Sequence, residues 1–248
     1  DPRRQPQRLQ LRLRRLQAGV RREHLSATLG IELPAQLGHL LEAQLALPLP
    51  LPEPLALPAD WDAHVSGTAI ELARLLAYVT GDAGALRGGA GDVDLRVNFR
   101  NGRWEQVAAQ FSLGSVAVAG AAATTAYERI SGRGQWQRVE GGWDASVTDL
   151  RLRRAGRDAP ATTGELQQRE AGEGAPVRWT ASAGFLRLDD LFPLVRAGLA
   201  GTALEARLPR QLAGDLRDIT AEFAVRSGER TRYSVRFGFT HMALANAT

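Results

Sequence analysis

Hydrophobic and polar residues alternate with a period of two along most of the chain. In residues 25–33 and 41–49, a Leu, Ile or Ala stands at every second position. The clearest case is 93–99, where Val, Leu, Val and Phe are separated by Asp, Arg and Asn. Successive side chains of a strand point to opposite faces, so this pattern is typical of strands with one buried face. The sequence therefore predicts a mainly β, antiparallel protein whose sheet has one apolar face.

Two segments depart from this alternation and carry apolar residues at nearly helical spacing, at 70–79 and 186–195. They predict short helices over Leu72–Val79 and Asp189–Ala197, the second with acidic residues in its first turn, where they oppose the helix dipole. The two segments align with one another, and each precedes a predicted strand with Gly-Asp near its start. The alignment indicates an internal repeat, although chance similarity between two amphipathic helices explains it equally well.

Turn residues divide the predicted strands into hairpins. Asn101-Gly102, the strongest short hairpin signal, follows the strand at 93–99. A slip in the pattern near Gln106 predicts a bulge in the return strand. A second hairpin is predicted around Glu140–Gly142, and a further turn at Ser227–Thr231.

The chain is expected to consist of four parts. A run of prolines between positions 48 and 58 interrupts strand pairing, because proline lacks the amide hydrogen. Residues 1–58 are therefore expected to form N-terminal strands and a proline-rich linker. Residues 59–154 and 176–248 are expected to be two β repeats, each with one short helix. Residues 155–175, with little periodicity, are expected to form a flexible loop between the repeats.

Composition narrows the possible function classes. The chain has 248 residues and a formal net charge of +4, and it contains no lysine, so all 31 basic side chains are arginine. Most of them alternate with apolar or acidic residues, which favours a solvated face over a nucleic-acid site. The absence of cysteine excludes disulfides and fits a compartment such as a periplasm. No apolar run is long enough to span a membrane as a helix, so any anchor is expected outside this chain.

No motif for catalysis or metal binding is found. The four histidines lack the i,i+4 spacing of metal ligands, and no HExxH motif occurs. His64 falls on the polar phase of its predicted strand. The glycine-rich segment at 88–91 lacks the lysine of a phosphate-binding loop. The sequence predicts neither an enzyme nor a bound metal or cofactor.

Short motifs resemble the YhdP/AsmA-like family of Gram-negative envelope proteins. The resemblance extends from about Leu25 to the end of the chain. The motifs lie at Ile70–Val79, Gly91–Phe99, Asn101–Trp104, Gly132–Trp136, Phe185–Val195 and Leu212–Ile219. The resemblance implies a very long protein with an inner-membrane anchor, a periplasmic body and a groove-shaped sheet, of which this chain would be a fragment. It also implies bridge-like phospholipid transport between the inner and outer membranes, and it carries over no catalytic residues.

The expected fold is an elongated, twisted antiparallel sheet curled into a groove, with two short helices. An aliphatic groove suits acyl chains, whose burial is worth roughly 0.8 kcal/mol per methylene and requires no specific residue. Because a strand sends its in-phase residues to one face, the candidate groove-lining residues follow the apolar phase. They are Val93, Leu95, Val97, Phe99, Phe111, Leu113, Trp179, Ala181, Tyr233, Val235, Phe237 and Phe239.

The expected partners are phospholipid, the inner membrane through an anchor outside this chain, and other envelope proteins. The expected location is the periplasm, and nucleic acid is not an expected partner. One rival hypothesis is a structural or protein-interaction β module with a closed core. Another is an outer-membrane barrel, whose strands also alternate; the two helices, and aromatic residues without the spacing of girdles, oppose it. An apolar face open along its length would favour lipid, and a closed core would favour the structural hypothesis.

Overall fold

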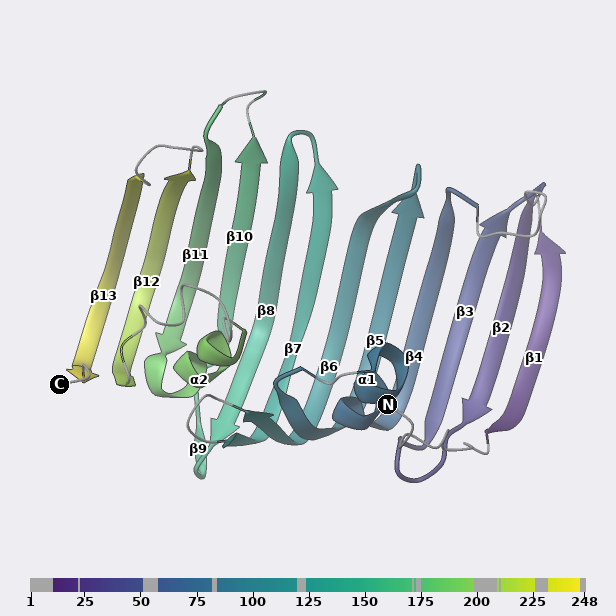
Figure 1. The fold of residues 1–248 in the computed structure, drawn as a ribbon, viewed down its shortest axis with the longest axis horizontal. Helices are drawn as coiled ribbons and strands as arrows, with labels where there is room; N and C mark the ends of the chain where they lie inside the picture. Colours follow the sequence, from purple (N-terminus) through teal and green to yellow (C-terminus); the bar gives the residue numbers. More distant parts are fainter. Residues whose placement is uncertain are drawn as a thin grey trace, which may run out of the picture.

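The computed structural model describes residues 11–21, 23–50, 58–81, 84–119, 124–170, 172, 175–198, 209, 211–225 and 232–245. In this part of the chain, thirteen strands form one antiparallel sheet (Figure 1). The strands are β1 (Arg12–Arg21), β2 (His24–Glu32), β3 (Leu40–Pro48), β4 (Trp61–Glu71), β5 (Leu86–Arg100), β6 (Arg103–Ala119), β7 (Thr124–Val139), β8 (Gly142–Arg154), β9 (Arg157–Asp158), β10 (Thr162–Glu170), β11 (Val177–Arg187), β12 (Gln211–Val225) and β13 (Arg232–Ala245).

The strands follow one another across the sheet in chain order. Each pairs with its neighbours in sequence, except that the short β9 pairs only with β8, so that β10 takes the next place. The path begins at β1 and ends at β13, and the sheet does not close on itself. This is the architecture that the period-two alternation predicted: an extended, mainly antiparallel sheet.

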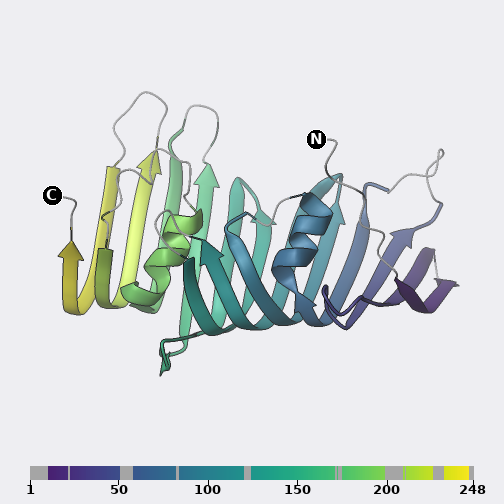
Figure 2. The ribbon, with the colours of Figure 1, turned by 60° about the horizontal axis from the view of Figure 1, so that its bottom comes forward.

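Two helices interrupt the meander, as expected. Helix α1 (Leu72–Thr80) directly follows β4, and helix α2 (Leu188–Gly198) directly follows β11. Each lies in the connection between two adjacent antiparallel strands, at the same end of the sheet (Figure 1). The sheet curls toward the side that carries both helices (Figure 2). The two aligned sequence segments therefore take equivalent places in the fold.

The predicted turns have the expected geometry. Asn101 and Gly102 have φ values of 52° and 71°, the left-handed values that a two-residue hairpin turn with matching twist requires. The register between β5 and β6 shifts after Asn98, so the bulge predicted near Gln106 is confirmed. Val139 pairs with Gly142 across the second hairpin. The turn predicted at Ser227–Thr231 lies outside the described residues.

One expectation about local structure is wrong. Little regular structure was expected between 155 and 175, yet β10 occupies the centre of this segment and pairs with both β8 and β11. The alternation is weak here because the positions in phase with Leu166 include Gly164 and Gln168, which carry no large apolar side chain. A paired strand does not require such a side chain at every inward position. The division of the chain into four parts stays a prediction.

The buried core lies between the helices and one end of the sheet. Leu113, Val116 and Tyr127, from β6 and β7, form one cluster, against which Leu72 of α1 and Leu194 of α2 pack. A second cluster joins Leu33, Leu37 and Ile70, with Leu75 of α1 beside it. Both helices therefore cover the apolar face of the sheet, but only at the end where they lie.

Candidate lipid-binding face

The strand register brings the candidate lining residues to one face. Residues directly opposite in an antiparallel pair share a face, and Ala181 is linked in this way through Leu166, Ala145, Trp136 and Val107 to Val97. The face continues to β13 through the pairs Ala181–Ala221 and Ala221–Val235. Phe237 and Phe239 follow on the same strand, with ring centroids 6.2 Å apart. We call this surface the apolar face.

The candidate residues differ in what covers them. Val93, Phe111 and Leu113 belong to the cluster beneath the helices, and they act as ordinary core. At the other extreme, Tyr233, Val235 and Phe239 on β13 are 75%, 46% and 62% exposed. The face on β1 is also open, with Leu16 and Val20 both 66% exposed. In the described part of the chain the two helices are the only second layer over this face.

A polar contact fixes α2 on the apolar face. Asp190, in the first turn of the helix, is 2% exposed, and its carboxylate lies 3.6 Å from Arg154 and 3.8 Å from Arg187. The hydroxyl of Tyr127 donates a hydrogen bond of 2.5 Å to the backbone carbonyl of Asp190. Burial raises the pKa of Tyr127 to about 12. The acidic first turn predicted from sequence is therefore present, and it also serves as an anchor.

The structure gathers aromatic side chains at the end of the apolar face opposite the helices. Trp61 begins β4, whose other end leads into α1, and it stacks on Phe99 at a centroid distance of 5.0 Å. Phe99 packs edge-on against Trp104 at 5.4 Å, as Trp143 does against Trp179. Cross-strand pairs then continue from Trp179 through Phe223 to Tyr233. We call these residues the aromatic row: Trp61, Phe99, Trp104, Trp143, Trp179, Phe223 and Tyr233.

The aromatic row corrects an expectation. The sequence predicts aromatic residues without the spacing of girdles, and the candidate lining residues do not include Trp61, Trp104 or Trp143. The signal that could have found them is their position just after a turn. Trp104 follows the turn at Asn101-Gly102, and Trp143 follows the one at Glu140-Gly141. Alternate hairpins of a meander turn at the same end of a sheet, so residues just after those turns lie at one end.

Comparison with known proteins decides the family. The YhdP protein family matches residues 1–247 of the chain. The chain belongs to the YhdP family. Neither the curated proteins nor the solved structures contain a match. Within the described residues of this YhdP-family chain, no helix has the length and apolar character needed to cross a membrane.

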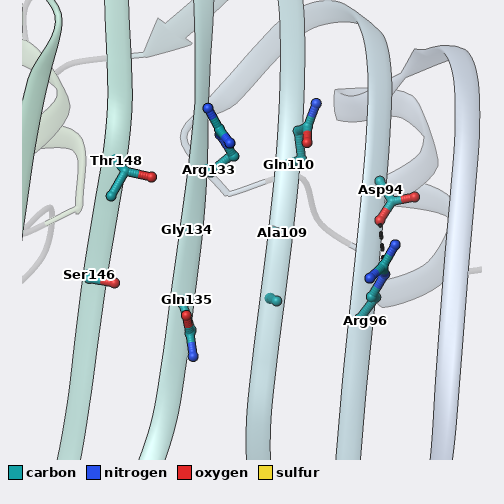
Figure 3. A pocket seen from close by; sticks show the side chains of 10 residues that line it. Asp94, Arg96, Ala109, Gln110, Arg133, Gly134, Gln135, Ser146 and Thr148 are labelled. Atoms are coloured by element: carbon teal, nitrogen blue, oxygen red, sulfur yellow. Dashed lines mark ion pairs between the residues drawn. The ribbon is translucent and has the colours of Figure 1, made fainter.

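The opposite face of this YhdP-family sheet is polar, and several of its charges form ion pairs. Figure 3 shows a shallow hollow on it, lined by residues of β5 to β8, where Asp94 and Arg96 form an ion pair of 3.6 Å. Arg133 donates a 2.8 Å hydrogen bond to Asp149 and lowers the pKa of that carboxyl group. His64 lies on this face, as its phase predicted, with Nε2 2.6 Å from Asp94. In the described residues no group of three or more acidic or histidine side chains could hold a metal ion.

Proposed function

We propose that this chain is a lipid-conducting segment of an envelope protein, whose apolar face shields phospholipid acyl chains during transport between the inner and outer membranes. The observation that carries the proposal is the apolar face itself, continuous from β1 to β13 and covered only in part. Exposed apolar patches of this extent mark an interaction surface rather than a free surface in water. Membership of the YhdP family supports envelope lipid transport at the level of the family.

The chemistry of the face suits transport. Between the helices and the aromatic row, most of its positions apart from Trp136 are filled by small or aliphatic residues, such as Ala63, Ala145 and Ala181. These side chains offer an acyl chain dispersion contacts and removal from water but no hydrogen bond, so the binding free energy changes little as a lipid slides. The proposal requires no catalytic group, and its setting is the periplasm.

The alternative hypothesis is that the chain is a structural or protein-interaction module, in which the same face would pack against protein. In a closed sandwich, a second sheet would cover it. The described residues form a single sheet that two helices cover only in part, so a module of this kind would need a further layer from outside these residues to cover the face. The occupant of the face therefore separates the two functions.

Photo-crosslinking in the envelope identifies that occupant. Leu166 lies on the apolar face in β10, opposite Ala145 and Ala181, and its neighbour Glu165 lies on the polar face, opposite Ser146 and Ser182. A photoreactive residue at 166 is expected to capture phospholipid, and the same residue at 165 is the matched control. Capture of protein at 166 would favour the interaction module, and equal lipid capture at both positions would remove the proposal.

A further inference from the structure

Among the described residues, one arginine lies within the aromatic row. Arg138, near the end of β7, pairs with Trp143 of β8, and it follows Gly134 and Trp136 of the apolar face at intervals of two residues. Its side chain is exposed. Its Nε donates a hydrogen bond of 3.1 Å to the backbone carbonyl of Trp104, and its guanidinium carbon lies 5.8 Å from the ring centre of Trp136. The carbonyl of Trp104 and the ring of Trp136 thus hold this cation at the border of an apolar surface, opposite Trp143 in the strand register.

Among the described residues, Arg138 has no acidic partner. Arg100 of β5 and Arg169 of β10, each two strands away from β7, form ion pairs of 2.6 and 2.5 Å with Asp62 and Asp144. Arg133, on the polar face of the same strand, pairs with Asp149. Arg138 forms no ion pair with any acidic residue that the structure describes. Because its Nε is already bonded, the two terminal nitrogens remain to face a ligand.

We propose that Arg138 binds the phosphate of a phospholipid, with the aromatic row at the level of the headgroup and the acyl chains on the apolar face toward the helices. The proposal rests on the proposed function and adds the orientation of the lipid. A guanidinium can bind two phosphate oxygens at once. Tryptophan and tyrosine favour the level where lipid headgroups meet hydrocarbon, because each has an apolar body and a polar tip.

The alternative is that the row only packs the ends of the strands. The stacking of Trp61 on Phe99 fits that alternative. However, Trp104 and Tyr233 remain 49% and 75% exposed, more than packing among themselves would leave. A purely structural row also gives no reason for a cation without an acidic partner on the apolar face. A phosphodiester supplies both the negative charge and the hydrocarbon that such a border requires.

The test compares two lipids that share acyl chains and differ in the phosphate. The chain is offered phosphatidylglycerol or diacylglycerol in detergent, and the lipid retained after gel filtration is measured. The unaltered chain is expected to retain phosphatidylglycerol about tenfold better, as befits one charge-assisted interaction. Arg138→Gln is expected to remove that preference while leaving diacylglycerol binding unchanged. Arg133→Gln, on the polar face of the same strand, is expected to retain it.

The outcomes separate this inference from the proposed function. If the unaltered chain retains neither lipid, the proposed function fails. If it retains both and Arg138→Gln keeps the full preference for phosphatidylglycerol, the phosphate site is wrong although the apolar face binds lipid. Diacylglycerol binding also reports whether the variant is folded. If Arg138→Gln does not fold, the test rests on the unaltered chain alone. A preference of that chain for phosphatidylglycerol over diacylglycerol below about twofold would then overturn the inference.

Discussion

The hydroxyl of Tyr127 in β7 donates a 2.5 Å hydrogen bond to the backbone carbonyl of Asp190, in the first turn of α2. Tyr127 is 1% exposed and also belongs to the apolar cluster beneath the helices. Arg154 of β8 donates a second bond of 2.6 Å to the carbonyl of Asp189. The start of α2 is thus fixed to the middle of the sheet by polar contacts within an apolar environment, where hydrogen bonds are costly to lose.

The first prediction concerns this contact and pH. Burial favours the neutral phenol and raises the pKa of Tyr127 from 10.0 to about 12. The folded state therefore holds a proton that the unfolded state releases first, so the stabilisation is complete below pH 10 and is lost as pH rises toward 12. Tyr127→Phe should lower the free energy of unfolding at pH 8 by about 1–2 kcal/mol. It should also weaken the decline between pH 10 and 12.

Denaturant unfolding at several pH values checks this prediction. The control is Tyr78→Phe, because Tyr78 on α1 is 59% exposed, and this variant should leave the free energy of unfolding at pH 8 unchanged. A Tyr127→Phe chain that still shows the full alkaline decline would contradict the assignment of that decline to Tyr127.

The second prediction concerns the close approach of β5 to β6. A Cβ atom added at Gly91 would overlap the backbone carbonyl oxygen of Ser112. Because the overlapping atom belongs to the backbone, no rotation of a side chain can relieve the clash. Gly91→Ala is therefore expected to destabilise the chain by about 1–3 kcal/mol, as overpacking typically does. Gly184→Ala in β11 is the matched control, since nothing lies within 4 Å of the added atom. Thermal unfolding that ranks the two variants equally would contradict this account of the β5–β6 contact.

Much of the fold could be predicted from the sequence because its rules are local. Period two fixes which residues of one strand share a face, as Val93 and Leu95 do, and the spacing of Leu72 and Leu75 fixes a helix. Neither inference needs to know which strands are neighbours. The strand at 162–170 was missed because the prediction used only the local pattern, which glycine and glutamine weaken here. Hydrogen bonds to the strands on either side hold this strand in place.

The aromatic row and Arg138 depend on information that is not local. Arg138 and Trp104 are brought together because β6 and β7 are neighbours whose register places Gln106 opposite Gln137. A shift of one residue in that register would move one set of side chains to the other face. The alternation predicts the phase of Arg138 but not its partners, so its unmatched charge is visible only once the acidic residues around it are located.

The third prediction concerns a contact that recurs at two strand ends. Arg169 donates hydrogen bonds to the backbone carbonyls of Trp143 and Gln168 and forms an ion pair with Asp144. Arg100 likewise donates to the carbonyls of Trp61 and Phe99 and forms an ion pair with Asp62. Because these pairs are half-buried, a double-mutant cycle of Arg169→Gln with Asp144→Asn should give a coupling energy of about 0.5–1 kcal/mol. The separated pair Arg169→Gln with Asp62→Asn should give none. Equal values would show that the pairing of Arg169 with Asp144 is not specific.

The last prediction tests the use of the apolar face through two adjacent residues of β13. Val235 pairs with Ala221 on the apolar face, and Arg236 pairs with Thr220 on the polar face. Val235 is 46% exposed, so an aspartate there remains hydrated in the lipid-free protein, and folding should change by less than about 1 kcal/mol. Once an acyl chain covers the site, the carboxylate loses water without gaining a partner, which costs several kcal/mol. Val235→Asp should therefore reduce phospholipid retention at least tenfold, and Arg236→Asp should not, as measured by native mass spectrometry of chains with matched unfolding curves. If both variants retain as much lipid as the unaltered chain, lipid does not reach this part of the face. If both variants lose lipid to the same extent, the two faces do not differ in their contact with lipid.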